Sequence, residues 1–318
     1  MTSLKDLVKN LRSQSLVAII CHIRPDGDAL GSACALKNAL NDIGVTAHAF
    51  CDDTVPEKFN FLVAKGEVSN APLSQNYSAL VSVDCADITR LGVYANDFLA
   101  HKNTFNIDHH VSNNGYAKYN YVCDKPSNAL NIYEIIVELG APISKQTANL
   151  LEMGIMTDTG CFTHQDVDKE AHLVTAELID KGANLNEIYF NTFKKQTKAR
   201  AKLFGMVMSK LRFFHQDRFC VASIFQKDFE FTGAHQSETE GFVDFIMGID
   251  GVEVGACVME MGENKYKISL RSKGPNVNAV ALSFGGGGHI LASGCQINSE
   301  YEDVIDKLAF AVSRELID

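Results

Sequence analysis

Histidine and aspartate side chains gather in four short polar segments of this 318-residue sequence. The first segment, His22-Ile23-Arg24-Pro25-Asp26-Gly27-Asp28, places one imidazole and two carboxylates within seven residues. The others are Asp84, Asp108-His109-His110, and residues 153–160, which contain Asp158. Carboxylate oxygens suit hard divalent cations, and imidazole suits the manganese, iron and zinc series. The sequence therefore offers the ligands of a metal site. If these ligands hold two cations about 3.5–4 Å apart, the cations could stabilise the attacking and leaving oxygens of an in-line displacement at phosphorus.

Each segment also has an interpretation without a metal. Asp28 could cap a following helix, and Asp84 could be a turn residue. The histidine pair could be structural, and Asp158 could cap or end a helix. We favour metal binding because so many aspartates would be strongly unfavourable together without cations.

The residues around these segments predict the elements that position them. Short β-rich runs lie at residues 16–21, 45–50, 79–83 and 104–107, and helical patterns lie at residues 29–43, 128–139 and 145–156. This alternation predicts an α/β fold whose N-terminal domain has a doubly wound, mainly parallel sheet. Ligands of such sheets bind at the carboxyl ends of the strands, and His22, Asp84 and Asp108 directly follow predicted strands.

The second half of the chain predicts a smaller α/β domain with a mixed or antiparallel sheet. Strand patterns at residues 219–225, 252–260 and 265–271 accompany helical patterns at 239–247 and 301–316 and a glycine-rich turn. Residues 189–204 contain five basic residues and no acidic one. We therefore expect a catalytic domain at residues 1–188, a helical basic linker at 189–204 and a second domain at 205–318. A solvated helix face is our preferred interpretation of the linker charges.

Composition excludes several classes of protein. With 46% hydrophobic and 21% charged residues, the chain can bury substantial cores in about two domains. The net charge of −10 argues against a protein that binds long nucleic-acid duplexes, although it allows binding of a short nucleotide in a local site. The longest early apolar run, residues 16–21, is too short for a membrane span or a signal peptide. Nine scattered cysteines without a C-x-x-C pair indicate reduced thiols and a cytoplasmic protein.

Four motifs, taken in their order along the chain, resemble those of the DHH phosphoesterases. They are H-x-x-P-D-G-D-A-x-G-S, the single aspartate Asp84, D-H-H and G-x-x-T-D-T-G. The segment Ser269-Leu270-Arg271-Ser272, followed by four glycines and His289, resembles the associated DHHA1 substrate domain. The resemblance covers nearly the whole chain. It is strongest to the two-domain group of nanoRNases and 3′-phosphoadenosine-5′-phosphate phosphatases.

The resemblance implies two divalent cations, with manganese preferred and magnesium, cobalt or iron as alternatives. One cation would be held by His22, Asp26 and Asp84, and the other by Asp28, Asp84, His109 and Asp158. Asp108 would orient the histidine that follows it. His110 would contact the scissile phosphate or help to protonate the leaving group.

The resemblance also implies a phosphate site in the second domain. Arg271 suits bidentate recognition of a phosphate. Gly286, Gly287 and Gly288 let the backbone approach the phosphate closely, and His289 adds a donor. The sequence leaves the role of Arg90 undecided. It could lie near the site or contact a phosphate, or it could form a surface ion pair.

We expect a phosphoesterase that hydrolyses short single-stranded RNA or DNA oligonucleotides, including linear dinucleotides, to 5′-mononucleotides. Removal of the 3′-phosphate of 3′-phosphoadenosine 5′-phosphate, to give AMP, would use the same site. One alternative is a pyrophosphatase or exopolyphosphatase with the same two-metal chemistry, and another is a nucleotide-binding module without catalysis. We expect no binding of long duplex or of membranes. The sequence leaves the oligomeric state open, with a homodimer as one option.

Overall fold

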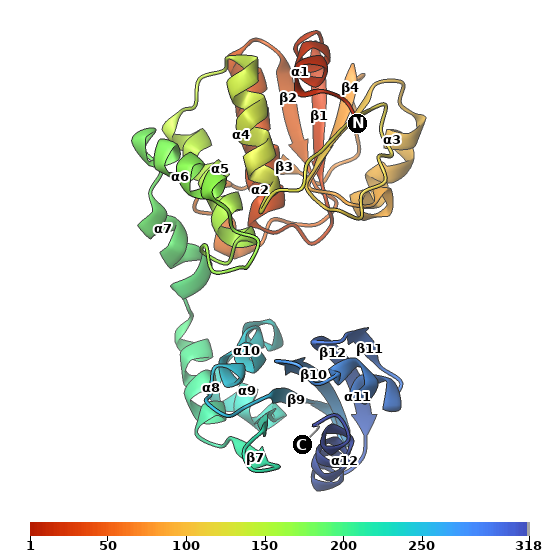
Figure 1. Cartoon of the computed structure of the whole chain (residues 1–318), viewed down its shortest axis with the longest axis vertical. Helices are drawn as coiled ribbons and strands as arrows, with labels where there is room; N and C mark the ends of the chain where they lie inside the picture. Colours follow the sequence, from red (N-terminus) through yellow and green to blue (C-terminus); the bar gives the residue numbers. More distant parts are fainter. Residues whose placement is uncertain (317–318) are drawn as a thin grey trace. The chain divides into compact units, whose positions relative to one another are not determined.

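The structure is a computed structural model that describes residues 1–316. The chain forms two compact units, Met1–Lys195 and Gln196–Asp318, which we call unit 1 and unit 2 (Figure 1). The division between the units falls inside the basic segment at residues 189–204. Within the described residues, no helix is both long enough and apolar enough to span a membrane.

Unit 1 contains a six-stranded sheet in the order β3-β2-β1-β4-β5-β6. The strands are β1 (Leu16–Cys21), β2 (Thr46–Phe50), β3 (Val68–Ser69), β4 (Ala79–Val83), β5 (Thr104–Asp108) and β6 (Tyr119–Val122). Every neighbouring pair is parallel, which confirms the predicted doubly wound sheet. The strand order reverses between β1 and β4, and ligands of such sheets bind at this switch point.

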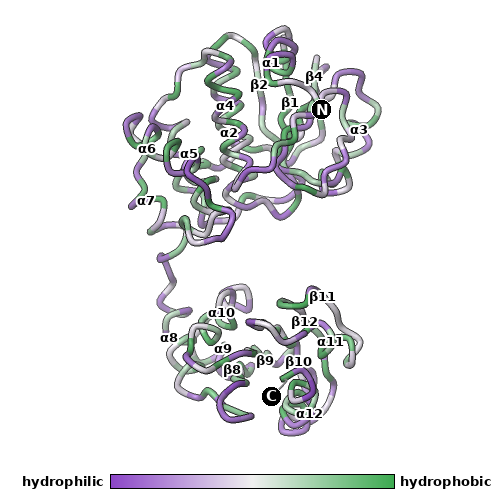
Figure 2. The backbone as a smooth tube through the Cα atoms, viewed as in Figure 1, coloured by the Kyte–Doolittle hydropathy of each residue, from purple (hydrophilic) through white to green (hydrophobic). Residues whose placement is uncertain are grey.

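Helices cover both faces of this sheet. They are α1 (Leu4–Arg12), α2 (Gly27–Asp42), α3 (Ala95–Ala100), α4 (Asn128–Leu139), α5 (Lys145–Asp158), α6 (Lys169–Asp180) and α7 (Leu185–Tyr189), with short helices η1 (Glu57–Phe59), η2 (Ile88–Tyr94) and η3 (Phe190–Lys194). Hydrophobic residues concentrate in the central strands and in α2 and α4 (Figure 2). The α2 side of β1 packs against the larger core, and the opposite side packs against residues of η2 and α3.

Helices α2 and α5 approach each other closely at Gly31. A Cβ atom at this position would lie 2.3 Å from the carbonyl oxygen of Leu150, so only glycine fits. Because α2 begins with Asp28 in its first turn and α5 ends with Asp158, this contact helps to set the spacing of the two carboxylates.

The predicted strands 16–21 and 79–83 and the predicted helix 128–139 have the bounds that we expected. Helix α2 begins at Gly27, before the predicted residue 29, because Asp26 is its N-cap. The Asp26 Oδ1 atom accepts hydrogen bonds from the backbone amides of Asp28 and Ala29. The interpretation of Asp28 as the cap of this helix was therefore wrong.

Unit 2 contains a second six-stranded sheet, in the order β11-β12-β10-β9-β8-β7. Its strands are β7 (Arg212–Phe214), β8 (Phe219–Ile224), β9 (Val254–Gly262), β10 (Lys265–Ser272), β11 (Gly287–His289) and β12 (Ala292–Asn298). Only the β8–β9 pair is parallel, so the sheet is mixed, as predicted. The predicted glycine-rich turn includes the short strand β11, which pairs with β12.

The helices of unit 2 are α8 (Lys198–Met208), α9 (Gln226–Thr232), α10 (Phe242–Met247), α11 (Val277–Ser283) and α12 (Tyr301–Ser313), with the short helix η4 (Gln236–Thr239). The basic segment is helical on both sides of an extended residue, Lys195. Arg200 departs from the solvated-face interpretation, because its guanidinium donates hydrogen bonds to the carbonyl oxygens of Glu238 and Glu240.

Candidate active site

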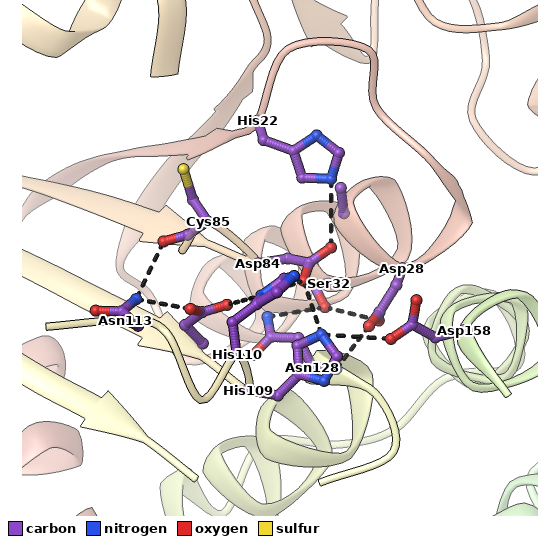
Figure 3. A network of polar contacts seen from close by, with 12 residues as sticks. His22, Asp28, Ser32, Asp84, Cys85, His109, His110, Asn113, Asn128 and Asp158 are labelled. Atoms are coloured by element: carbon purple, nitrogen blue, oxygen red, sulfur yellow. Dashed lines mark hydrogen bonds and ion pairs between the residues drawn. The ribbon is translucent and has the colours of Figure 1, made fainter. Parts of the chain in front are cut away.

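The predicted metal ligands lie together at the carboxyl ends of β1, β4 and β5, beside the start of α2 and the end of α5 (Figure 3). All six predicted ligands belong to groups whose candidate donor atoms lie within 4.8 Å of one another. The groups found among residues 1–316 are His22, Asp26 and Asp84; Asp28, His109 and Asp158; and Asp84, Asp108, His109 and His110. Segments that are up to 136 positions apart in the sequence, from His22 to Asp158, thus meet at one edge of the sheet.

Asp84 lies between two histidines and presents a different oxygen to each. Its Oδ2 atom is 3.5 Å from Nε2 of His22, and its Oδ1 atom is 3.3 Å from Nε2 of His109. The same His22 nitrogen lies 3.6 Å from Oδ2 of Asp26. The same His109 nitrogen lies 3.3 Å from Oδ2 of Asp158. Asp84 is therefore common to two histidine–carboxylate clusters.

These donor atoms fit divalent cations. Adjacent ligands of an octahedral ion with bonds of about 2.1 Å lie about 3 Å apart, and a tetrahedral ion sets them slightly farther apart. The distances from the histidine nitrogens to the carboxylate oxygens are close to these values. In addition, the Oδ1 atom of Asp84 is buried and accepts no hydrogen bond of good geometry, which is costly unless a cation or another donor reaches it.

Backbone carbonyl groups orient both imidazoles for this role. The Nδ1 atom of His22 lies 2.7 Å from the carbonyl oxygen of Ile23, and Nδ1 of His109 lies 2.8 Å from that of Lys125. A carbonyl oxygen can only accept, so Nδ1 of His109 carries the proton when its ring is neutral. The lone pair of Nε2 then faces the carboxylates, as a metal ligand requires.

The carboxylates give the cluster a strong preference for positive charge. Burial opposes protonation of His22, but Asp26 and Asp84 outweigh it and raise the pKa of His22 to about 10. Burial likewise opposes protonation of His109, whereas Asp84 and the neighbouring carboxylates raise its pKa to about 10. Burial raises the pKa of Asp158 to about 6, an effect that His109 partly offsets. A bound cation would take the place of these protons.

Asp28 has a second contact that the sequence did not reveal. Its Oδ2 atom accepts a hydrogen bond from the amide of Asn128 at 2.6 Å, and its Oδ1 atom accepts from the amide of Ala129 at 2.8 Å. Asp28 thus caps the N-terminus of α4 while lying within the His109 and Asp158 group. The Oδ1 atom also accepts from the Ser32 hydroxyl at 3.4 Å, whereas Oδ2 keeps a second lone pair, so capping leaves Oδ2 of Asp28 able to bind a cation.

Asp108 forms a hydrogen-bonded pair with His110 beside the cluster. It does not orient His109, the histidine that directly follows it, because Nδ1 of His109 faces the carbonyl oxygen of Lys125, so our expectation for Asp108 was wrong. The Nδ1 atom of His110 lies 2.8 Å from Oδ1 of Asp108, which is fully buried at the end of β5. The other oxygen, Oδ2, accepts a hydrogen bond from Nδ2 of Asn113 at 2.6 Å (Figure 3). We did not identify Asn113 from the sequence, since nothing distinguishes it from its polar neighbours Ser112 and Asn114.

Arg90 lies beside the site. Its Nη2 atom is 3.0 Å from Nδ1 of His22, and its carbonyl oxygen accepts a hydrogen bond from the amide of Ile23. Arg90 has no ion pair within residues 1–316, so the structure favours a role near the site over a surface ion pair.

The predicted phosphate-binding residues of unit 2 also lie together. In the sheet, Arg271 of β10 and His289 of β11 both pair with Ala292 of β12. Directly paired residues of antiparallel strands point to the same face, so the two side chains share one face of the sheet. A Cβ atom at Gly286 would lie 2.2 Å from the carbonyl oxygen of Gly294, and one at Gly288 would lie 2.6 Å from that of Ala292. Glycine is therefore required for the loop to pack against β12.

Comparison with known proteins agrees with this arrangement. A profile of the DHH family, N-terminal domain, matches residues 16–155, and a profile of the DHHA1 domain matches residues 216–317. The bifunctional oligoribonuclease and PAP phosphatase NrnA of Thermus thermophilus is 29% identical over 306 residues, which span 94% of this chain and 90% of that protein. The protein of the same name from Bacillus subtilis is 26% identical over 92% of this chain and 93% of its own length.

A solved structure has a similar fold. It is that of an exopolyphosphatase-related protein from Bacteroides fragilis, with a TM-score of 0.85, 23% sequence identity, and coverage of 98% of this chain and 95% of that chain. One profile matches the domain that carries the aspartate–histidine cluster, and the other matches the domain that carries Arg271 and the glycine-rich turn. The chain therefore belongs to the metal-dependent DHH phosphoesterases, with a DHHA1 domain, and is a hydrolase of phosphoester bonds.

Proposed function

We propose that this enzyme hydrolyses short oligonucleotides to 5′-mononucleotides and also removes the 3′-phosphate of 3′-phosphoadenosine 5′-phosphate. The observation that carries the proposal is the position of Asp84 between two histidine–carboxylate clusters at the switch point of the sheet. Two relatives whose names include both activities align over more than nine-tenths of this chain.

We propose that the site holds two divalent cations and that manganese is preferred. One would be bound by His22, Asp26 and Asp84, and the other by Asp28, Asp84, His109 and Asp158. When bound, such cations neutralise charge on phosphoryl oxygens and lower the pKa of water. An anomalous difference map recorded at the manganese edge should contain two peaks, one in each group. A single peak, or none, would contradict the two-cation site.

In this proposal, His110 handles the proton of the leaving group. Asp108 accepts the Nδ1 hydrogen of His110 and stabilises the charged imidazole, so that Nε2 can donate a proton to the departing oxygen. Asp108 is itself held by Asn113, which limits the movement of the pair.

We propose that Arg271, His289 and the backbone of Gly286, Gly287 and Gly288 bind the terminal phosphate of the substrate. The guanidinium of Arg271 is held by two contacts: Nη1 donates to the carbonyl oxygen of Leu270 at 3.0 Å, and Nε lies 3.3 Å from Oδ1 of Asp244. Replacement of Arg271 by lysine should raise KM with little change in kcat, because lysine keeps the charge and loses the planar fork. An unchanged KM would contradict this role.

The substrate is tested by a length series with manganese, from a 5′-phosphorylated dinucleotide to a long single strand. The same assay should include 3′-phosphoadenosine 5′-phosphate, pyrophosphate and polyphosphate. We expect kcat/KM to be highest for oligonucleotides of a few residues, and a preference for pyrophosphate or polyphosphate would overturn the proposal. His109→Ala and Asp158→Ala should abolish hydrolysis. His215→Ala, which changes an exposed histidine after β7, should not.

We also propose a cytoplasmic location. All nine cysteines are free thiols, a state that reducing compartments maintain. Fractionation of the source cells with detection of the native chain would test this, and recovery outside the cytoplasm would contradict it.

A further inference from the structure

Three neighbouring aromatic side chains are exposed near the end of unit 1. Tyr189 is the last residue of α7, and Phe190 and Phe193 belong to η3, which follows it directly. These residues are 37%, 54% and 40% exposed. Aromatic rings gain much free energy from burial, so three of them left in solvent side by side indicate a binding surface. Together they form a surface that we name the aromatic platform.

The backbone of η3 arranges this surface. The helix is a π-helix, in which the amide of Lys195 donates to the carbonyl oxygen of Phe190 at 2.7 Å. Side chains three and four residues apart are neighbours on an α-helix, whereas the wider π turn also brings together residues five apart. Lys194 accordingly lies over the ring of Tyr189, with its Nζ atom 5.6 Å from the ring centre.

Two of the rings are stacked without a ligand. The rings of Tyr189 and Phe193 have centres 5.7 Å apart, and their planes differ by 30°. A surface that is already ordered loses less entropy when a ligand binds. Single π turns inside helices are frequent at functional sites, which agrees with a binding role for this one.

The charge around the aromatic platform is positive, although the whole chain has a net charge of −10. Lys194 and Lys195 are exposed, and neither forms an ion pair within residues 1–316. The preceding acidic residue, Glu187, accepts a hydrogen bond at its Oε2 atom from the side-chain amide of Asn184 at 3.1 Å. An anionic partner is therefore attracted to this surface.

The aromatic platform lies on the catalytic side of unit 1. Helix η3 packs against η1, and η1 belongs to the connection between β2 and β3. Because β3 pairs with the last residues of β2, this connection stays at the carboxyl edge of the sheet, where the aspartate–histidine cluster also lies. Helix α7 packs against α5, whose last residue is Asp158 (Figure 1).

Aromatic faces combined with unpaired lysines suit single-stranded nucleic acid. Bases stack on such rings, and the phosphates pair with the cations. A duplex hides the faces of its bases, so it fits this surface less well. A membrane also fits less well, because helices that lie on membranes are commonly 20–30 residues long, whereas α7 and η3 have five residues each.

We propose that the aromatic platform stacks with bases of a single-stranded oligonucleotide, in the part of the strand that extends from the active site, while Lys194 and Lys195 pair with its phosphates. The proposal rests on the proposed hydrolysis of oligonucleotides. It adds a surface that favours strands of several residues over 3′-phosphoadenosine 5′-phosphate, which has a single base. One stacked base strengthens binding about fivefold or more.

The test compares the binding of a dinucleotide and a hexanucleotide of thymidine to the manganese-loaded full chain. In both ligands a 3′-methylene group replaces the bridging O3′ atom of each linkage. This change keeps the negative charge and removes the bond that is broken when 5′-mononucleotides are released, so binding is measured without turnover. We expect the hexanucleotide to bind about fivefold or more tightly. Equal dissociation constants would overturn the proposal.

Phe190→Ala and Phe193→Ala remove rings from the aromatic platform. The two changes combined should reduce the advantage of the hexanucleotide by about fivefold or more and leave dinucleotide binding unchanged. Phe193→Tyr should keep the advantage and Phe193→Leu should lose part of it, because leucine is apolar but cannot stack. Phe231→Ala removes an exposed ring of α9 and is the matched control, which should keep the advantage. An advantage that survives the double change, or an equal loss for both ligands, would overturn the proposal.

The two lysines are tested through the salt dependence of hexanucleotide binding. Lys194→Gln combined with Lys195→Gln should reduce the slope of log K against log salt concentration by about 1. Lys5→Gln combined with Lys9→Gln, at exposed positions of α1, is the matched control and should keep the slope. An unchanged slope in the first pair would overturn the role of the lysines.

Vesicles of phosphatidylcholine and phosphatidylserine test the membrane alternative. We expect the full chain not to sediment with them, and sedimentation that Phe190→Ala abolishes would overturn the proposal in favour of a membrane surface.

Binding of the methylene ligands is separate from the proposed function. Absence of hydrolysis of ordinary oligonucleotides would contradict the proposed function, whatever the binding of the methylene ligands. Normal hydrolysis, together with a hexanucleotide advantage that the double change leaves intact, would contradict the aromatic platform alone.

Discussion

The side-chain amide of Asn113 donates a hydrogen bond to Oδ2 of Asp108 at 2.6 Å, and the same nitrogen donates to the carbonyl oxygen of Cys85 at 3.1 Å. Its Oδ1 atom accepts from Asn106 at 3.0 Å and from the amide of Gly115 at 2.8 Å. These partners fix which atom of the Asn113 amide faces Asp108. Asn113 therefore acts on the site through Asp108.

Replacement of Asn113 by aspartate should put a carboxylate oxygen against Asp108. We expect kcat for a dinucleotide to fall by about 10- to 100-fold, because His110 loses the fixed position of its partner. A p-nitrophenyl nucleotide ester should lose much less, since its leaving group needs little help from a proton donor. Steady-state kinetics on the two substrates measures this difference.

Asn114→Asp is the control for this experiment, because it makes the same change at the exposed neighbouring residue. Equal losses on both substrates in Asn113→Asp would mean that Asn113 is needed for the structure alone.

Gly31→Ala should separate α2 from α5, because the added Cβ would lie 2.3 Å from the carbonyl oxygen of Leu150. We expect the free energy of unfolding to fall by about 1–3 kcal/mol. Since α2 carries Asp28 and α5 carries Asp158, the manganese concentration for half-maximal activity should also rise. Urea unfolding and a manganese titration measure the two effects.

Gly205→Ala in α8 provides a matched control. A Cβ there meets no atom within 4 Å, so the variant should gain about 0.5–1 kcal/mol from helix propensity. A stabilised Gly31→Ala variant would show that the contact between α2 and α5 is not as close as described.

Glu152 of α5 should make stability fall between pH 4.5 and 7. It is fully buried, neither oxygen has a hydrogen-bond partner of good geometry, and burial raises its pKa from 4.5 to about 7, although Thr175 offsets part of the shift. The folded chain keeps the proton over a range in which the unfolded chain loses it. The contribution of Glu152 to the free energy of unfolding is therefore fully present below pH 4.5 and is lost as the pH rises through 7.

Glu152→Gln removes this titration. Relative to the unmodified protein, the variant should gain stability as the pH rises from 4.5 to 7, by up to about 3 kcal/mol. Urea unfolding at several pH values measures the gain, with Glu138→Gln at an exposed position of α4 as the control. A difference that does not depend on pH would show that Glu152 titrates normally.

The strands of unit 1 could be predicted from the sequence more readily than the rest of the fold, for a physical reason. The strands that precede His22 and Asp84 are buried on both sides and are therefore continuous apolar runs, which mark their own ends. A polar residue directly after such a run lies at the edge of the sheet where ligands bind. This pattern was enough to place His22, Asp84 and Asp108 at one edge.

Contacts between segments that are distant in the sequence could not be predicted from such a pattern. The cap that Asp28 provides for α4 depends on how two helices pack, and the amide of Asn113 reaches Asp108 only because the loop folds back over β5. Helix α6 was missed altogether. Strand β12 was also missed, because Gly294 and Ser293 have low strand propensity and are held there by the pairing with β10.

The central claim, that the cluster around Asp84 supports metal-dependent hydrolysis of short oligonucleotides, is tested most directly by restoring manganese to chelator-treated enzyme. The measured quantity is the rate of mononucleotide release from a 5′-phosphorylated dinucleotide as the manganese concentration rises, for the unmodified chain and for Asp84→Asn. We expect no release without a divalent cation, saturable recovery in the unmodified chain and none in the variant. Release by the metal-free enzyme, or full recovery in Asp84→Asn, would contradict the account.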